Sequence, residues 1–536
     1  MMTTESQSAT GRLRDRAHTL SALQTRHEPW DVVVVGGGIT GAGVAREAAR
    51  RGLATLLLEQ RDFAWGTSSR SSKMVHGGLR YLAQGDFKLT RDALRERERL
   101  VHEAPTLVKR TGYWWTHRKG QFPGRIGFGL ALELYDRLAG IRDHRFVPRD
   151  AYLREVPGHN PRKLVGATYF TDSTVDDARL VLRVLDEAVA DGALALNYAR
   201  VTSLLREGGR VHGVHLHDEV TGASLEVRAR VVINATGAWA DGLRSEVVDE
   251  KKVRPLRGSH IVFARARLPL TEVIGFAHQA DKRPVFIYPW EGATIVGTTD
   301  LDHTAELNDE PRISAEELDY LLSGVQREFP DAQLTRDDIV ATWAGVRPVV
   351  ASGKGIDPSK ERRDHVVWDD SGLVSVTGGK LTTFRLIALD ALAAAQRYVP
   401  GLDARDTREP TFRRPPVTGP SALSQQARER VEGRYGMLTR RFFDEMPADE
   451  LTPLGDTDTL VADLRWAARH EAVVRLEDLM LRRTRLGLLL RDGGSEHAAL
   501  IQQTVQQELG LDDAAYAQSW SDYLALVRSS YSLPAP

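Results

Sequence analysis

The chain has 536 residues, a formal net charge of −1 and no cysteine. This length allows two to four domains with an ample core, and the balanced charge excludes an overall basic field of the kind that collects nucleic acid. The lack of cysteine excludes disulfides, thiolate metal sites and a cysteine nucleophile, and it fits a protein of the reducing cytoplasm.

The N-terminal segment, residues 1–29, is polar and lacks the apolar stretch of a secretory signal. We expect it to be a flexible extension, with an arm packed on the fold as the alternative. No apolar run in the chain approaches the roughly 20 residues that a membrane-spanning helix needs.

The first predicted strand, VVVV at residues 32–35, leads directly into GGGITG at residues 36–41. Such an apolar run is typical of a strand buried on both faces of a parallel sheet. The six residues after it match the GxGxxG pattern. Gly36 permits a tight turn, Gly38 leaves room for a pyrophosphate beside the backbone, and Gly41 lets the next helix lie close to the strand.

A predicted helix, GAGVAREAARRG, and a second predicted strand, ATLLLE, follow this turn. The N–H groups at the helix start face the phosphates of a dinucleotide, and the carboxylate of Glu59 at the strand end accepts hydrogen bonds from a ribose. A glycine-rich turn that serves packing alone does not explain this acid. We therefore predict cofactor contacts from Gly36, Gly38, Ile39, Thr40, Gly41 and Glu59.

Seven later segments resemble, in order and approximate spacing, the FAD-dependent, aerobic-type glycerol-3-phosphate dehydrogenases: TSSRSSKMVHGGLRYL, VDDARLV, VVINATGAWAD, RGSHIVF, VFIYPW with TIVGTTD, WAGVRPV and VSVTGGKLTTFR. The resemblance is strong over about residues 30–395. It is weaker in the C-terminal region, where LMLRRTRLGLLL matches best. A mild departure is Thr40, where related chains often have asparagine.

The resemblance implies FAD as cofactor, sn-glycerol 3-phosphate as substrate, dihydroxyacetone phosphate as product and a quinone as acceptor. Because a quinone is lipid-soluble, it also implies a cytoplasmic protein at the periphery of the inner face of the cell membrane. No nucleic-acid partner is expected, and the chain is compatible with a homodimer.

The implied fold is that of D-amino-acid oxidase and glycine oxidase: an α/β, Rossmann-like FAD-binding domain with an antiparallel-sheet substrate lobe. We expect the FAD-binding domain to be discontinuous, from residues 30–110, 165–255 and 340–400, and the lobe to come from residues 111–164 and 256–339. In the lobe, RPVFIYPWEGATIVGTTDL reads as two strands joined by a hairpin turn.

The composition of the sequence changes near residue 401. The proline-rich EPTFRRPPVTGPSALS predicts a linker at residues 401–417. Apolar residues at helical spacing then predict an all-α domain over residues 418–536.

The implied reaction needs a cationic cradle for a phosphate, an acceptor for a hydroxyl proton and stacking of carbon 2 over the flavin. Arg347 in GVRP is the first choice for the anion, because arginine offers a planar fork of donors. Arg80 and Arg363 resemble further anion contacts, with structural or solvated arginines as the alternative. Lys380 in GGKLTT is expected at the phosphate or at the polar edge of the flavin.

A histidine is favoured as the base, because its ordinary pKa is close to neutral. The candidates are His260 in GSHI and His76 in VHGG. As an alternative, Arg347 stabilises the developing alkoxide without a classical base. Tyr81 is expected either to donate a hydrogen bond to the substrate or to pack.

Small and hydroxyl-bearing residues of the resembling segments are expected around the cofactor, with ordinary turn and helix-cap use as the alternative. For the pyrophosphate or ribityl chain these are Thr67, Ser68 and Ser69, and Gly237 lies beside the cofactor. For the flavin ring they are Gly378, Gly379, Lys380, Leu381, Thr382 and Thr383.

The stretch THRKGQFPGRIGFGLALELYDRLAG, residues 116–140, is a candidate for shallow insertion into a membrane. The alternative is an amphipathic helix packed on the lobe. Trp114 and Trp115 lie just before it, and tryptophan favours membrane interfaces, although core packing explains the pair equally well.

Three other functions remain open at this point. The first is oxidation of the same substrate with oxygen as acceptor and peroxide as product. The second is an amine oxidase of the same fold, which the lysine and arginine set disfavours. The third is a flavin-binding redox sensor or assembly factor without turnover.

Overall fold

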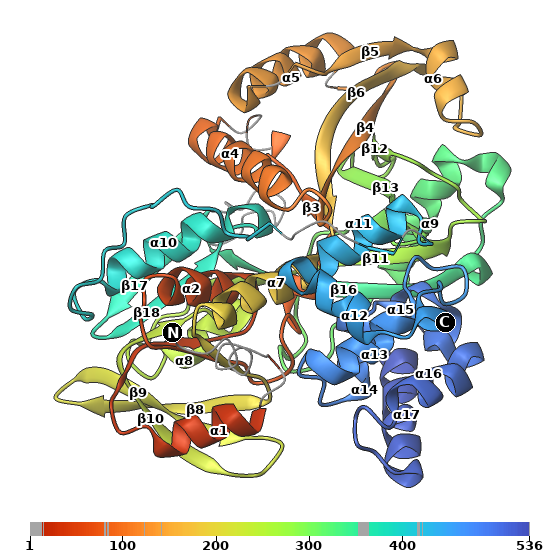
Figure 1. Cartoon of the computed structure of the whole chain (residues 1–536). Helices are drawn as coiled ribbons and strands as arrows, with labels where there is room; N and C mark the ends of the chain where they lie inside the picture. Colours follow the sequence, from red (N-terminus) through yellow and green to blue (C-terminus); the bar gives the residue numbers. More distant parts are fainter. Residues whose placement is uncertain are drawn as a thin grey trace.

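The computed structural model describes residues 13, 16–79, 82, 85–122, 124–140, 142–351, 364–414, 419–420 and 422–534. Within these residues the strands form two sheets, one of eight and one of ten strands. Figure 1 shows the C-terminal helices, in blue, beside the second sheet. This arrangement confirms the predicted α/β fold with a second, mainly antiparallel sheet and a helical C-terminal region.

The centre of the first sheet is parallel, with the strands in the order β18 (Leu373–Gly378), β10 (Ser224–Asn234), β1 (Trp30–Val35), β2 (Thr55–Leu58) and β7 (Leu194–Leu196). At one edge β17 (His365–Asp370) pairs antiparallel with β18. The hairpin of β8 (Ala199–Glu207) and β9 (Arg210–Asp218) continues from β10.

Both faces of β1 are buried, as its run of valines predicts. Val32 and Val34 lie in the core that the sheet shares with α2 (Ile39–Ala49), α7 (Asp177–Ala190) and α10 (Phe384–Ala395). Val33 and Val35 lie in a separate core on the opposite face. The turn after β1 is therefore at the carboxyl edge of a covered parallel sheet, where this type of fold binds ligands.

The N-terminal segment differs from the flexible extension that its polarity predicts. Residues Arg16–Thr25 form a helix, α1, in which Leu23 is buried. Arg16 donates a hydrogen bond to the carboxylate of Asp218 at the end of β9. The described part of this segment is thus a packed arm, because Leu20 and Leu23 pack on the first sheet and Arg16 binds Asp218 and the carbonyl of Asn197.

The second sheet has the order β15 (Leu301–Asp302), β11 (Val253–Ala264), β14 (Ala293–Gly297), β13 (Pro284–Trp290), β12 (Val273–Ala277), β4 (Val108–Arg118), β6 (Leu164–Val175) and β3 (Met74–Val75). β16 (Ile339–Val350) pairs with β11, and β5 (Arg145–Pro148) pairs with β6. The predicted hairpin is present as β13 and β14, joined by Glu291 and Gly292, both with positive φ, as a type I′ turn requires.

The strand pairing divides the chain differently from the predicted segments at three strands. β3, β6 and β16 fall almost entirely within predicted segments of the FAD-binding domain but belong to the second sheet. An apolar strand pattern shows that a strand is buried but not which neighbour it joins, so the sequence carries no signal for this assignment.

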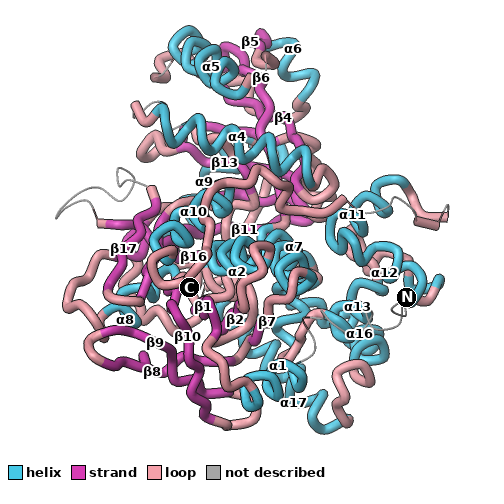
Figure 2. Tube along the Cα trace, turned by 60° about the vertical axis from the view of Figure 1, so that its left-hand side comes forward, coloured by secondary structure: helices cyan, strands magenta, loops and turns pink. Residues whose placement is uncertain are grey.

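The remaining helices lie against one of the two sheets or form the C-terminal region. Helices α4 (Phe87–Glu103), α5 (Arg125–Ala139), α6 (Arg149–Glu155), α8 (Ala240–Arg244) and α9 (Ala315–Glu328) precede residue 400. The C-terminal region contains α11 (Gln425–Tyr435), α12 (Thr439–Glu445), α13 (Val461–His470), α14 (Leu476–Asp478), α15 (Leu486–Leu489), α16 (Ala498–Val505) and α17 (Asp513–Leu526). In Figure 2, α5 and α6 lie at the tip farthest from α1 and α17.

Candidate active site

The glycine turn after β1 has no space for side chains. A Cβ on Gly41 would lie 1.9 Å from the carbonyl oxygen of Gly36, and a Cβ on Gly36 would lie 2.5 Å from that of Ala235. Gly36 also has a φ of +112°, which glycine adopts readily. The backbone of α2 therefore approaches β1 closely and points its first N–H groups out of the turn.

Glu59, at the end of β2, binds the same turn. Its carboxylate accepts hydrogen bonds from the backbone N–H of Gly37 at 2.6 Å and of Arg61 at 2.8 Å, and burial raises the pKa of Glu59. The hydroxyl of Ser68 accepts a hydrogen bond from the N–H of Ile39 at 3.0 Å. The acid, the hydroxyl and the bare glycine backbone thus lie together, which fits an adenine dinucleotide.

Segments far apart in the sequence converge beside this turn. The hydroxyl of Thr67 donates to the carbonyl of Val346 in β16. That of Thr377 in β18 donates to the carbonyl of Gly237 at 3.0 Å, and that of Thr382 donates to the carbonyl of His76 at 3.3 Å. These hydrogen bonds make neighbours of four of the resembling segments: residues 67–82, 231–241, 343–349 and 375–385.

Arg347 lies on β16, with its guanidinium over a residue that has no side chain. A Cβ on Gly258 in β11 would lie 2.4 Å from the guanidinium. Arg347 forms an ion pair with Asp300 at 3.1 Å and donates to the hydroxyl of Thr298 at 3.2 Å. The Arg347 side chain is 22% exposed, so the planar fork is reachable from solvent.

His260 lies on β11 and is fully buried. Its Nε2 is 2.9 Å from the hydroxyl of Ser72, and its ring stacks on Trp343 at a centroid distance of 4.7 Å. Burial, together with the positive charges of Arg347 and Lys73, holds the pKa of His260 well below its ordinary value. The ring is therefore neutral at physiological pH, in the form that can accept a proton.

Comparison with known proteins decides the family. Residues 31–385 match the family model of FAD-dependent oxidoreductases, and residues 392–516 match that of the C-terminal domain of alpha-glycerophosphate oxidase. Glycerol-3-phosphate dehydrogenase 2 of Mycobacterium tuberculosis H37Rv is 36% identical over 532 residues, which cover 94% of this chain and 88% of the relative. The chain belongs to the FAD-dependent glycerol-3-phosphate dehydrogenase family.

Two further relatives agree with this family. The aerobic glycerol-3-phosphate dehydrogenase of Bacillus subtilis is 33% identical, over 88% of this chain and 89% of its own. The solved structure of the glycerol-3-phosphate dehydrogenase from Bacillus halodurans, complexed with FAD, has a TM-score of 0.74 and 25% identity, and the match covers 96% of this chain and 98% of that one. FAD is accordingly the cofactor of the family, as the sequence predicts.

The remaining predicted site residues that the structure describes lie in turns or in partly buried positions. His76 and Lys380 are half-buried, and Gly378 and Gly379 both have positive φ. Ser69 lies in the short 3-10 turn Thr67–Ser69, and Leu381 and Thr383 lie in the short 3-10 turn Leu381–Thr383. Arg80, Tyr81 and Arg363 lie outside the described residues.

A buried ionic cluster, which the sequence patterns did not predict, lies next to Ser69 of the candidate site. Lys73, Asp177 and Arg485 all have fully buried side chains, and the carboxylate of Asp177 pairs with both cations. The signal was present within the quoted segments, because LMLRRTRLGLLL places three arginines in an apolar run. Charged residues at such positions are almost always paired inside a fold.

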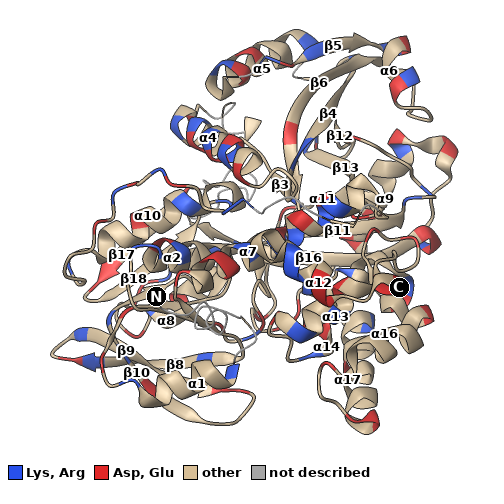
Figure 3. Cartoon of the chain, in the orientation of Figure 1, with Lys and Arg blue, Asp and Glu red and all other residues tan. Residues whose placement is uncertain are grey.

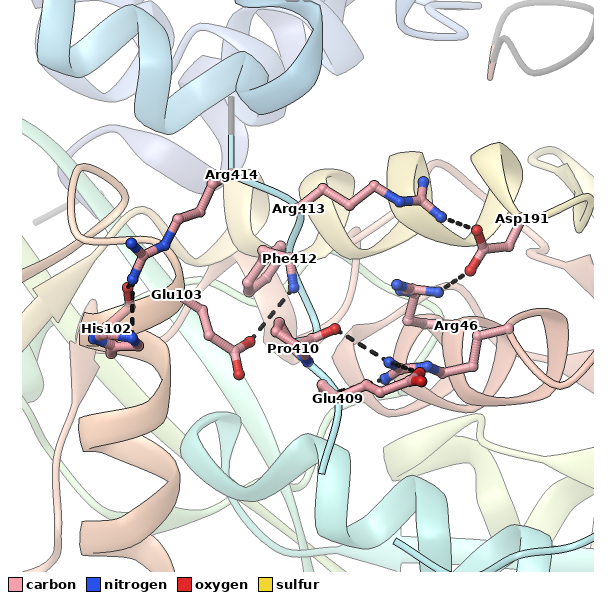
Figure 4. Close-up of a pocket in the computed structure, with 10 residues that line it drawn as sticks. Arg46, His102, Glu103, Asp191, Glu409, Pro410, Phe412, Arg413 and Arg414 are labelled. Carbon is pink, nitrogen blue, oxygen red and sulfur yellow. Dashed lines mark hydrogen bonds and ion pairs between the residues drawn. The ribbon is translucent and has the colours of Figure 1, made fainter. Parts of the chain in front are cut away.

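A pocket of 790 Å³ lies away from these residues (Figure 4). It is formed by the C-terminal end of α2, opposite the end that carries the glycine turn, and by residues 409–414 of the linker. Arg50 binds Glu409 at 2.7 Å, Glu103 accepts from the N–H of Thr411 at 2.6 Å, and Arg414 donates to the ring of His102 at 2.9 Å. These charges attach the linker to α2 and α4, which accounts for the polar lining without a ligand.

The tryptophan pair before α5 lies inside the second lobe. Trp114 is 3% exposed and Trp115 is 9% exposed, and Trp115 stacks on Phe128 of α5. The two tryptophans are therefore core residues of the second lobe. Among the described residues, no helix is both long enough and apolar enough to cross a membrane.

Proposed function

We propose that the chain oxidises sn-glycerol 3-phosphate to dihydroxyacetone phosphate with bound FAD and passes the electrons to a membrane quinone. The main support is that relatives named as glycerol-3-phosphate dehydrogenases align with nearly the whole chain. The convergence of the resembling segments at one site adds to this support.

The proposed FAD site follows the carboxyl edge of the first sheet. The pyrophosphate lies on the glycine turn and the first residues of α2, and Glu59 receives the adenosine ribose. Residues Thr67–Ser69 and Gly237 contact the middle of the cofactor, and residues 378–383 contact the flavin ring. Bound FAD supplies the hydride acceptor for carbon 2 of the substrate.

Arg347 is the proposed phosphate ligand. Its side chain is 22% exposed and donates to Thr298. It lies one residue from Val346, whose carbonyl accepts from Thr67, one of the residues proposed at the middle of the cofactor. The carboxylate of Asp300 beside Arg347 would repel a phosphate. We therefore propose that phosphate binding breaks the ion pair between Asp300 and Arg347. Lys380 is the proposed second cation, and Arg80, Arg363 and Tyr81 remain candidates from the resemblance.

A neutral histidine is the proposed acceptor of the hydroxyl proton. His260 is unprotonated, but the burial and positive charges that lower its pKa also make it a weaker base. It also lies behind Ser72, so the proton would pass through that hydroxyl. His76 is half-buried and lies next to the segment of Thr382, which gives it more direct access. Stabilisation of the alkoxide by Arg347 remains the alternative without a classical base.

Replacement of Arg347 tests the phosphate assignment. Arg347→Ala should keep FAD but lower kcat/KM for glycerol 3-phosphate about 30- to 1000-fold, the value of ~2–4 kcal/mol for a lost charged hydrogen bond. Arg347→Lys is the matched control, because it keeps the charge and loses the fork. Its kcat/KM should lie between those of the wild type and Arg347→Ala. Unchanged kcat/KM in Arg347→Ala would refute the assignment.

A quinone acceptor requires contact with lipid, and α5 offers a suitable surface. Phe122 is 93% exposed, Ile126 72% and Leu130 68%, while Lys119, Arg137 and Arg142 are exposed nearby. Figure 3 shows basic residues along α5 and β5 at this tip. Exposed apolar side chains bordered by basic ones fit shallow insertion into an anionic membrane surface.

The acceptor itself is decided by turnover. The proposal expects rapid reduction of a short-chain quinone and little hydrogen peroxide when purified enzyme is given glycerol 3-phosphate in air. Stoichiometric peroxide without preference for the quinone would instead make the protein an oxidase.

A further inference from the structure

Residues 66–75, here called loop 66–75, connect the two ends of the site. Near its start, Ser68 accepts a hydrogen bond from the first N–H of α2 at 3.0 Å. Near its end, the hydroxyl of Ser72 is 2.9 Å from the ring of His260. A displacement of this loop would therefore disturb both the proposed pyrophosphate contact and the histidine.

Lys73 holds this loop from the interior. Its ammonium group donates to the carbonyl of Ser69 at 2.6 Å and to the two carboxylate oxygens of Asp177 at 2.9 and 3.0 Å. Ser71 also donates to Asp177, from its hydroxyl at 2.7 Å and its N–H at 2.9 Å. Lys73 has a φ of +58°, a conformation that a non-glycine residue keeps only where its surroundings impose it.

The C-terminal region reaches the same groups. The guanidinium of Arg485, fully buried, donates to the carbonyl of Ser69 at 3.2 Å, to Asp176 at 2.8 Å and to Asp177. Arg485 and Lys73 thus bind the same carbonyl and the same carboxylate. A second link is Tyr531, whose hydroxyl is 3.2 Å from the guanidinium of Arg70 in the loop.

In this cluster Arg485 and Lys73 face Asp176 and Asp177, and Arg434 of α11 also reaches Asp176 at 3.4 Å. Apolar residues that fill the same space often stabilise a fold as well as a buried ion pair does. The planar fork of arginine, however, fixes several acceptors in one geometry. The arrangement therefore suits the placement of a loop better than stability alone.

We propose that the C-terminal helical region holds loop 66–75 in the conformation that receives FAD, with Arg485 as a positioning residue and Tyr531 as a second link. The inference rests on the FAD contacts proposed for Thr67–Ser69. It makes the C-terminal region part of the scaffold of the site.

The test compares two charge-preserving variants. Arg485→Lys loses the fork at loop 66–75. Arg430→Lys is the matched control, because Arg430 is also a buried C-terminal arginine that binds a carboxylate of the main body, Glu291 at 2.8 Å, with Asp463 at 2.6 Å as its other partner. The measurements are the Kd of the apoprotein for FAD, amide hydrogen exchange of residues 66–75 without FAD, and the melting temperature.

Arg485→Lys should raise the Kd for FAD and the exchange rate of residues 66–75 by about 10- to 100-fold, the effect of losing a charged hydrogen bond. Arg430→Lys should lower the melting temperature and leave both other quantities near wild type. Equal effects of the two variants, or no effect of Arg485→Lys, would overturn the proposal. None of the three measurements uses the substrate, so the result is independent of whether glycerol 3-phosphate is oxidised.

If Arg485→Lys does not fold, Tyr531→Phe decides the question. This variant removes one hydroxyl and keeps the ring. The lost hydroxyl accepts from Arg70 of the loop and donates to Glu310. The variant should raise the Kd for FAD about two- to tenfold, the effect of the one hydrogen bond that the loop loses, with a much smaller change in melting temperature than in Arg485→Lys. An unchanged Kd in Tyr531→Phe would overturn the proposal.

Discussion

At the scale of single residues, the site depends on atoms that are missing as much as on atoms that are present. Gly41 leaves its helix free to lie against the carbonyl of Gly36, and Gly258 leaves a place for the guanidinium of Arg347. The first approach is to a backbone oxygen, which cannot move far, whereas the second is to the end of an arginine side chain, which can turn away. Substitution at Gly41 is therefore the more direct test of geometry.

Gly41→Ala should abolish FAD binding, because the new Cβ would lie 1.9 Å from a backbone oxygen. Overpacking of this kind costs about 1–3 kcal/mol or more and moves α2 away from the turn. Gly242→Ala is the matched control, since a Cβ there meets nothing within 4 Å. Flavin content after reconstitution measures the difference, and a yellow Gly41→Ala protein with wild-type affinity would contradict the account.

His260 predicts how stability depends on pH. Its folded-state pKa is lowered by burial and by two positive neighbours, so below about pH 6.5 the unfolded chain binds a proton there that the folded chain does not. Stability should therefore fall as the pH drops below about 6.5, by up to ~1.4 kcal/mol per pH unit from this group.

His260→Gln removes that titration. Urea unfolding midpoints measured between pH 5 and 7 should fall more steeply with decreasing pH in the wild type than in His260→Gln. Parallel curves would mean that His260 is protonated in the folded state, which would contradict its assignment as a neutral acceptor.

At the scale of elements, α5 is apolar on two faces, and the fold covers only one of them. Phe128, Leu132 and Tyr135 pack into the second lobe, whereas Ile126, Leu130 and Leu134 are exposed. An exposed apolar face of this kind supports the proposed contact with a membrane surface.

Leu130→Glu should weaken binding to vesicles of phosphatidylglycerol and phosphatidylcholine by about tenfold or more, from lost apolar burial and added repulsion. Val220→Glu is the matched control, because Val220 is an exposed apolar residue, at 47%, in the β9–β10 turn of the first sheet. Co-sedimentation measures both variants, and equal binding of Leu130→Glu and Val220→Glu would exclude α5 as the membrane contact.

At the scale of the whole molecule, the sequence predicts best what is local. The strand, glycine turn and helix at residues 32–52 and the hairpin with Glu291 and Gly292 follow from short-range patterns. The family resemblance predicts which distant segments belong to the site. It does not predict that Trp114 and Trp115 are core residues, nor which sheet β16 joins, because those outcomes depend on neighbours that the pattern does not name.

Long-range ion pairs are the part that sequence patterns could not provide. Asp62, which follows β2, binds both Arg482 and Arg483, more than 400 residues later in the chain, at 2.5 and 2.6 Å. Arg179 of α7 binds Glu471 at 2.6 Å. A charge pattern indicates that such residues need partners, but only the fold selects them.

These buried pairs predict that the C-terminal region and the FAD-binding domain unfold together. Separation would leave several buried carboxylates unpaired, at about 3–5 kcal/mol for each broken pair. Urea unfolding of the holoenzyme, followed by flavin fluorescence and by far-ultraviolet circular dichroism, should give coincident transitions. Loss of helical signal before release of flavin would contradict this prediction.

The central claim is that one site binds FAD and offers carbon 2 of glycerol 3-phosphate to it. The most direct measurement is the visible spectrum of the purified protein, recorded without air before and after glycerol 3-phosphate is added. The account predicts a yellow protein whose flavin absorbance bleaches on addition of glycerol 3-phosphate and not on addition of glycerol or glycine. A colourless protein that cannot be reconstituted with FAD, or a flavin that glycerol 3-phosphate does not reduce, would contradict it.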